Sequence, residues 1–86
     1  MKIKEIENIN IENKEIYLKV FKNILNQIKS NSFNYKNQEF QDYIIINEQR
    51  LNSHFVHIVP KELITIFNKL KIDNPNDFLG FTILIG

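Results

Sequence analysis

The chain has 86 residues, of which 43% are hydrophobic and none is cysteine. This length fits a single domain, residues 1–86, with a thin margin of stability, and the lack of cysteine excludes disulfides and thiolate metal sites. The formal net charge of +1, from 11 basic and 10 acidic residues, argues against a protein that binds nucleic acid by neutralising phosphates. We therefore expect a small domain with no cofactor and no metal site.

The first ten residues, MKIKEIENIN, are charged throughout and contain no apolar core of a secretory signal. No apolar stretch approaches the about 20 residues needed to cross a bilayer. We therefore expect a cytoplasmic protein without membrane contact. Isoleucine, asparagine and lysine are frequent and alanine is missing. AT-rich codons produce this bias, so the composition indicates an AT-rich microbe, its phage or its plasmid.

The predicted elements begin with a strand over about residues 2–10. Its isoleucines at a spacing of three would also suit a helix, but Asn8 and Asn10 disfavour a helix interior. A helix follows, with Asn13 as its N-cap and Ser30 at its end. The side chains expected to face the core recur every four residues: Ile16, Val20, Ile24 and Ile28. The neighbouring Tyr17, Phe21 and Leu25 are expected to widen this buried row.

Two short apolar runs in the middle of the chain predict a β-hairpin. They are Tyr43–Glu48 and His54–Val59, joined by the five residues 49–53. Pro60 sets the backbone for a second helix over 61–71. The apolar stripe of that helix consists of Leu63, Ile66, Phe67 and Leu70.

The chain ends in a third clear strand, Phe81–Ile85, after the loop residues Asp73–Asp77. The order (β)αββαβ predicts an α+β fold: a small antiparallel sheet with two helices packed on one face, ferredoxin-like or a related two-layer sandwich. In the ferredoxin-like order the last strand lies at a sheet edge. Because that strand is apolar on both faces, it predicts a homodimer through the C-terminal strand, unless the protein itself covers both faces.

The segment Ser32–Tyr43 is the candidate partner-binding segment. It mixes aromatic rings with amide side chains, a combination typical of recognition loops. The candidate contact residues are Phe33, Asn34, Tyr35, Asn37, Gln38, Glu39 and Phe40. The alternative is that Phe33 and Phe40 only anchor this connection to the core while Tyr35 covers an edge.

No catalytic motif is visible in the chain. Its only glycines, Gly80 and Gly86, cannot form a phosphate-binding loop. His54 and His57 are three residues apart on a strand, which places them on opposite faces, so they cannot chelate one metal ion. A catalytic role would use one of them as a general base, with Glu48 or Lys61 nearby.

The sequence NSHFVHIVPKEL, followed by a helix, resembles part of the small ribonuclease toxins with a double-stranded-RNA-binding-domain-like fold. Those toxins carry a glycine-serine-histidine element on a strand before a helix. Here Asn52-Ser53-His54 stands at that place and the glycine is missing. The resemblance covers a minority of the chain and would imply an RNA-directed activity.

These observations favour a non-enzymatic protein-binding module that acts sterically on a protein target. The expected setting is an inhibitor of a defence system or an immunity-type protein from a phage, a plasmid or an AT-rich microbe. The alternative is an RNA-directed protein, either a ribonuclease-type toxin using His54 or His57, or a weak RNA binder using Arg50, Lys36 and Phe55.

Overall fold

The computed structural model describes residues 2–86, and over these residues it contains one antiparallel sheet of five strands and two α-helices. The elements in chain order are β1 (Ile3–Asn8), α1 (Lys14–Lys29), β2 (Gln38–Glu39), β3 (Tyr43–Arg50), β4 (Ser53–Pro60), a short 3-10 helix (Lys61–Leu63), α2 (Ile64–Asp73) and β5 (Gly80–Ile85). The strands lie in the order β1-β5-β4-β3-β2. The predicted α+β class, the antiparallel sheet and the first strand are confirmed.

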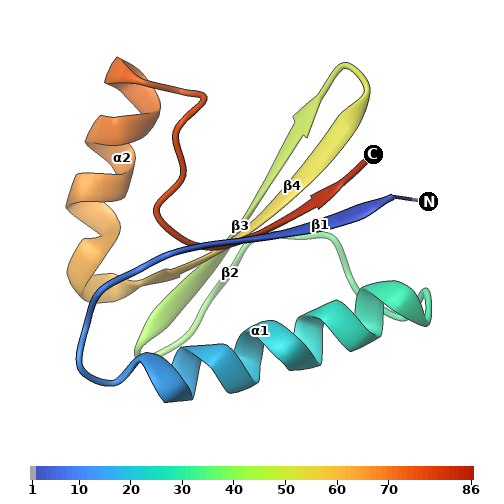
Figure 1. Ribbon diagram of the computed structural model, residues 1–86, viewed down its shortest axis with the longest axis horizontal. Helices are drawn as coiled ribbons and strands as arrows, with labels where there is room; N and C mark the ends of the chain where they lie inside the picture. The colour runs from blue at the N-terminus through green and yellow to red at the C-terminus, as the bar shows by residue number, and fades with distance from the viewer. Residues whose placement is uncertain (1) are drawn as a thin grey trace.

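The two helices cover opposite faces of the sheet, whereas the sequence predicts both on one face (Figure 1). α1 packs against the face that carries Val56 and Ile58 of β4. Phe67 of α2 contacts His57 instead, with 5.3 Å between the ring centroids, and His57 points the other way because side chains alternate along a strand. An amphipathic stripe shows that a helix packs on a sheet but does not show on which face, so the pattern could not decide this.

The last strand lies inside the sheet and not at its edge. β5 pairs with β1 on one side and with β4 on the other. Phe81 and Ile83 face α1, while Thr82 lies between them on the opposite face, and all three are fully buried. The apolar character of this strand therefore comes from its interior position. It has no free edge for the homodimer that the sequence predicts through it.

The buried side of α1 is rotated toward the residues that the sequence predicts at the border of the buried row. Tyr17, Phe21, Ile24, Leu25 and Ile28 are buried as expected, whereas Ile16 of the predicted row is 54% exposed. The ring centroid of Phe21 lies 5.0 Å from that of Phe81 on β5. An aromatic ring removes more apolar surface from water than an isoleucine side chain does, which favours this rotation.

The β-hairpin and α2 also differ in detail from the prediction. Arg50 pairs with Ser53, so the connection is the two-residue turn 51–52 and not five residues. In α2 only Phe67 is buried, while Ile66 of the predicted stripe is 59% exposed. α2 therefore covers its face of the sheet less completely than α1 covers the other. Neither helix of the described residues has the length and apolar character needed to span a bilayer.

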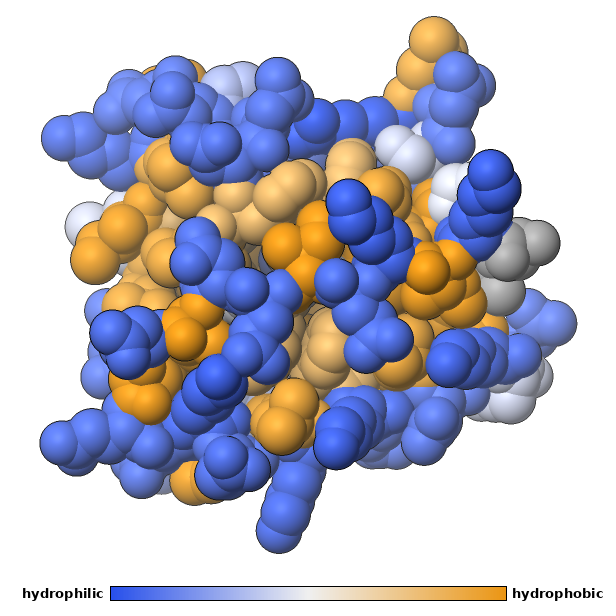
Figure 2. All heavy atoms as spheres, in the orientation of Figure 1, coloured by the Kyte–Doolittle hydropathy of each residue, from blue (hydrophilic) through white to orange (hydrophobic). Residues whose placement is uncertain are grey.

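Apolar surface remains on the side of the molecule along which β1 runs (Figure 2). The isoleucines of β1 and of the segment after it are only partly buried: Ile3, Ile6, Ile9 and Ile11. β1 is the outermost strand of the sheet on this side, so the apolar core lies close to the surface there.

Candidate functional site

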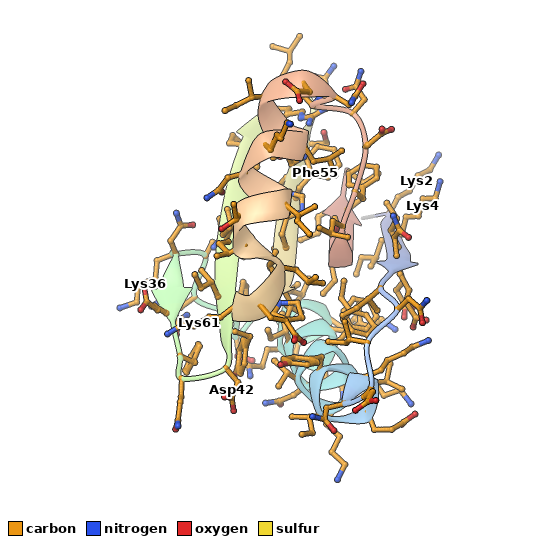
Figure 3. The ribbon with its side chains drawn as sticks, turned by 90° about the vertical axis from the view of Figure 1, so that its left-hand side faces the viewer. Lys2, Lys4, Lys36, Asp42, Phe55 and Lys61 are labelled. Carbon is orange, nitrogen blue, oxygen red and sulfur yellow. The ribbon has the colours of Figure 1, made fainter. Side chains whose placement is uncertain are left out.

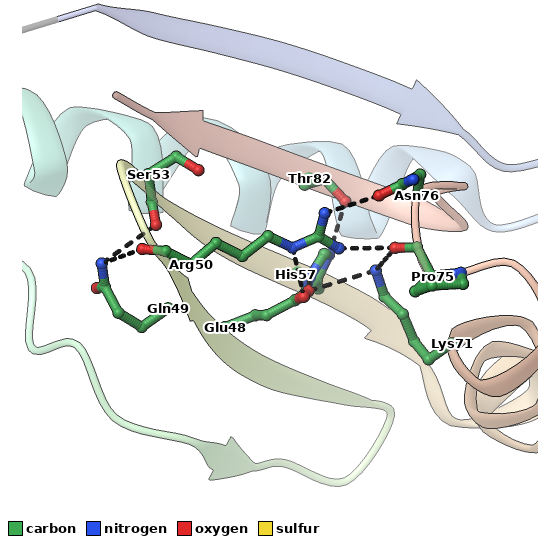
Figure 4. A network of polar contacts seen from close by, with 9 residues as sticks. All are labelled: Glu48, Gln49, Arg50, Ser53, His57, Lys71, Pro75, Asn76 and Thr82. Carbon is green, nitrogen blue, oxygen red and sulfur yellow. Dashed lines mark hydrogen bonds and ion pairs between the residues drawn. The ribbon is translucent and has the colours of Figure 1, made fainter.

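A polar network lies between the sheet and α2, with a buried part in the sheet and a partly exposed part at its border (Figure 4). His57 of β4 and Thr82 of β5 are both fully buried. Glu48 of β3 is at the centre of the network, and Arg50 and Lys71 reach it from β3 and α2. The network therefore joins three neighbouring strands to the helix that covers them.

The hydrogen bonds indicate which ring nitrogen of a neutral His57 carries the proton. Its Nε2 lies 3.0 Å from Glu48 Oε1, and its Nδ1 lies 2.9 Å from Thr82 Oγ1. A carboxylate only accepts hydrogen bonds, so Nε2 carries the proton and donates it to Glu48. Nδ1 of the neutral ring then accepts from the Thr82 hydroxyl.

Two cations complete the surroundings of Glu48. Arg50 Nε donates to Glu48 Oε2 over 2.7 Å, and Lys71 Nζ lies 3.3 Å from Glu48 Oε1. Both cations also donate to the carbonyl oxygen of Pro75, at 2.6 Å from Arg50 Nη2 and 3.2 Å from Lys71 Nζ. The loop after α2 is thereby attached to β3.

These contacts determine the charge states of the network. Burial raises the pKa of Glu48, but hydrogen bonds from Arg50 and His57 and the nearby Lys71 ammonium outweigh it and lower that pKa to about 2. Burial lowers the pKa of His57, and the Lys71 and Arg50 cations act in the same direction against the Glu48 carboxylate. At neutral pH the network therefore holds an ionised Glu48 and a neutral His57.

Stability is expected to fall in two stages as the solution is acidified. Burial lowers the pKa of His54 and His57 below the ordinary value of 6.5, so below that pH the unfolded chain binds protons that the folded chain does not. Between the ordinary pKa of 4.5 and about 2, Glu48 loses the charge that its partners stabilise. Urea unfolding at pH 7.5, 5.5 and 3 measures both stages. Glu48→Gln should reduce the second stage, and an equal free energy of unfolding at pH 7.5 and 5.5 would contradict the first.

The side chains of Glu48, His57 and Thr82 are hydrogen-bonded in a row, in the acid–imidazole–hydroxyl order of hydrolase triads. The prediction that Glu48 lies near a histidine is confirmed, whereas Lys61 pairs with Glu39 at 3.1 Å. His57 and Thr82 are both 0% exposed, so a substrate atom cannot come within reach of the hydroxyl. In this geometry the network positions α2 and the loop after it. Among residues 2–86, no three imidazole or carboxylate groups converge where a metal ion could sit.

His54 lies on the other face of the sheet, as the spacing predicts. Its Nδ1 is 2.8 Å from Gln49 Oε1, and its Nε2 is 2.9 Å from Asn47 Oδ1. Both neighbours are amide oxygens, and a neutral imidazole can donate a hydrogen bond to only one of them. The Asn47 amide nitrogen is buried and has no hydrogen-bond partner among the described residues. Both ring nitrogens of His54 are therefore in contact with side chains of β3.

The aromatic side chains of the candidate segment are held in place by other rings. Tyr35 packs edge-on against both Phe33 and His54, with centroids 4.9 Å apart in each pair. Phe40 stacks on Tyr43 at 4.7 Å. Tyr35 is nevertheless 45% exposed and Phe40 39% exposed. Phe33 packs against the core and anchors the segment, as the alternative interpretation expects, while Phe40 and Tyr35 keep exposed surface.

The polar residues of the segment have different roles. Asn37 Oδ1 accepts from the Asn47 backbone N–H over 2.7 Å, so this amide ties the segment to β3. Gln38 and Glu39 form β2, which pairs with Ile45 and Ile44 as the outermost strand. Asn34 accepts a backbone bond from Lys36.

A hollow of about 230 Å³ separates the segment from α1. Phe33, Gln38 and Phe40 line one side of it, and Val20 and Asn23 of α1 line the other. The structure thus brings three of the predicted contact residues together around one depression. Tyr35 lies beside a different hollow, with Gln49, His54 and Ile85.

The residues considered for RNA binding do not form a common surface. Phe55 is only 6% exposed, and the Arg50 guanidinium lies over its ring at 4.6 Å. Arg50 is further committed to Glu48 and Pro75. Lys36 lies in the segment before β2, at the opposite side of the sheet from Phe55 (Figure 3). A base therefore finds no open ring here on which to stack.

Comparisons with protein-family models, with curated proteins and with solved structures find no match for this chain. Inference about function therefore rests on the geometry of the molecule.

Sequence reasoning did not find the Arg50, Lys71 and Thr82 parts of the network. A signal was present for Thr82, because it is the one polar residue within the apolar strand 81–85. A buried polar side chain needs a partner, so Thr82 pointed to a polar neighbour across the sheet. Its pairing with His57 required the register of β4 and β5, which the sequence does not contain.

Proposed function

We propose that this chain is a non-enzymatic protein-binding module that uses the segment 33–40 to cover a surface of a protein target. Its action would be steric, as an inhibitor or an immunity-type protein. The frequent isoleucine, asparagine and lysine residues have AT-rich codons, and this bias supports a phage, a plasmid or an AT-rich microbe as the source of the chain. The network behind α2 would hold the scaffold together, and the aromatic segment would make the contact.

The observation that carries this proposal is that Tyr35 and Phe40 each pack against a neighbouring ring and are nevertheless exposed. Each ring is held by a neighbouring ring yet leaves 45% and 39% of its surface free. A ring that is already fixed loses little conformational entropy on binding and offers a large amphipathic contact area.

The position of the segment at the edge of the sheet adds further support. β2 is the outermost strand, and only two of its residues pair with β3. A partner can therefore approach this side without displacing a neighbouring element. A standard interface needs about 800 Å² from each partner, and the whole chain exposes 5635 Å².

The test is the double variant Tyr35→Ala/Phe40→Ala in a capture experiment from host lysate, with and without nuclease treatment. We expect the unchanged protein to retain one protein in stoichiometric amount after nuclease, and the double variant to retain at least about tenfold less, as for interface hot spots. The free energy of unfolding of each single variant should change by less than about 1 kcal/mol, because both side chains are partly exposed.

The matched control is Leu51→Ala, which removes a side chain that is 94% exposed at the hairpin turn. It should leave capture unchanged. Equal loss of capture in Leu51→Ala, or unchanged capture by a folded double variant, would contradict the proposed surface. Enriched or cleaved RNA, with proteins lost after nuclease, would contradict the proposed function and favour the RNA-directed alternative.

A further inference from the structure

A third hollow lies on the part of the sheet that α2 leaves uncovered. It has a volume of about 560 Å³, and its apolar lining includes Phe55 of β4 and Leu84 of β5. Lys2 and Lys4 line its other side, next to β1. This hollow is separate from the segment 33–40, which lies beyond β3 at the far edge of the sheet.

The strand register places both lysines on the same face as the apolar floor. Lys4 is opposite Leu84, and residues two apart on a strand share a face. Figure 3 shows Lys2 and Lys4 extending side by side from this end of the chain. Among residues 2–86, no ion pair includes either lysine.

The side-chain carboxylates near the hollow are either turned away or neutralised, and Gly86 also lines the hollow, with its backbone paired to that of Lys2. Glu5 and Glu7 of β1 alternate with the lysines, and Glu7 pairs with Lys14 of α1 on the other face. Glu48, on the same face as Phe55, is already bonded to Arg50 and His57. The hollow therefore combines an apolar floor with two lysine side chains at one of its borders.

An apolar floor next to lysine side chains is complementary to a ligand that is apolar at one end and negatively charged at the other. Small-molecule sites commonly have volumes of about 300–1,000 Å³, with a mainly apolar lining and a few polar groups that orient the ligand. A flexible lysine ammonium binds an anion as a point charge. An apolar cation or an uncharged polar molecule would lose one of the two kinds of contact.

We propose that this hollow is a binding site for a small apolar carboxylate, with its hydrocarbon part on Leu84 and the small exposed edge of Phe55 and its carboxylate at Lys2 and Lys4. The inference does not depend on the proposed function. A protein that fails to capture a partner through Tyr35 can still bind this ligand, and the reverse also holds.

The experiment is a titration of the ¹⁵N-labelled full chain, followed by its amide NMR signals. The probes are octanoate and octyltrimethylammonium, which have the same chain length and opposite charges. We expect octanoate to give saturable shifts centred on Lys4, Phe55 and Leu84, and to bind at least about fivefold more tightly than the cation, since two exposed ion pairs contribute a modest selectivity. Equal binding of the two probes, or octanoate shifts without saturation, would overturn the proposal.

Lysine variants separate the site from general surface charge. Lys2→Gln/Lys4→Gln should weaken octanoate binding about fivefold and should not weaken binding of the cation. Lys36→Gln removes one positive charge at the opposite side of the sheet (Figure 3) and should leave both unchanged. If Lys36→Gln weakened octanoate binding as much as Lys2→Gln/Lys4→Gln does, the proposal would be overturned. It would also be overturned if the same amides shifted with protein concentration alone, because a second copy of the chain would then cover the hollow.

Discussion

Glu48→Ala is expected to lower the free energy of unfolding by about 3 kcal/mol. The change leaves the buried Nε2–H of His57 without an acceptor, which costs about 1–3 kcal/mol. It also leaves Arg50 and Lys71 next to each other without the carboxylate that both contact, and removing one member of an ion-pair network costs about 3–5 kcal/mol when it is fully buried. Because the Glu48 side chain is 30% exposed, solvent reduces this second cost. Urea unfolding at pH 7 gives the value.

Two further variants test whether the network is the cause. Glu48→Gln keeps an oxygen that can accept from His57 but removes the charge, so it should cost about half as much, on the order of 1–2 kcal/mol. Glu39→Ala removes a carboxylate that is 70% exposed and pairs with Lys61, and it should cost less than about 1 kcal/mol. Similar losses for Glu48→Ala and Glu39→Ala would show that Glu48 is an ordinary surface residue.

Gly80→Ala is expected to cost about 3 kcal/mol or more, because the substitution meets two obstacles. The backbone of Gly80 has a φ of +90°, where a residue with a Cβ is strained by about 1–3 kcal/mol. A Cβ added there would also lie 2.6 Å from the carbonyl oxygen of Ile58. That oxygen belongs to the neighbouring strand β4 and cannot move aside without disturbing the sheet.

The second glycine of the chain provides the matched control. Gly86 lies at the other end of β5, and a Cβ there would be 3.6 Å from the nearest atom, the carbonyl oxygen of Asn52. Gly86→Ala should therefore change the free energy of unfolding by less than about 0.5 kcal/mol. The comparison is made by thermal or urea unfolding of both variants. Equal stability of the two would mean that β5 does not enter the sheet at Gly80 as the structure has it.

The local elements of this fold could be predicted from the sequence, but their arrangement could not. The isoleucines of α1 and the β-branched residues of β3 and β4 determine helix and strand through near-neighbour periodicity. The interior position of β5 depends instead on pairing with β1, across more than seventy residues of chain. So apolar a strand suits either an interior or a covered edge position, and the observed order β1-β5-β4-β3-β2 differs from the ferredoxin-like order that the sequence predicts.

The candidate sites were predictable to different degrees for the same reason. The alternation of side chains along β4 placed His54 and His57 on opposite faces, and the structure agrees. The partners of His57 come from β3 and β5, so they follow only from the strand register. The aromatic segment was visible from composition alone, whereas the exposed fraction of each ring depends on which neighbours hold it.

The measurement that tests the central claim most directly is site-specific photocrosslinking in host lysate. Phe40 and, separately, Leu51 are replaced by p-benzoylphenylalanine, and covalent adducts are identified by mass spectrometry. Both side chains are exposed, at 39% and 94%, so accessibility alone would favour Leu51. The proposed function predicts one dominant protein adduct from position 40 that survives nuclease treatment, and none of that protein from position 51. The same adducts from both positions, or adducts with RNA alone from position 40, would contradict it.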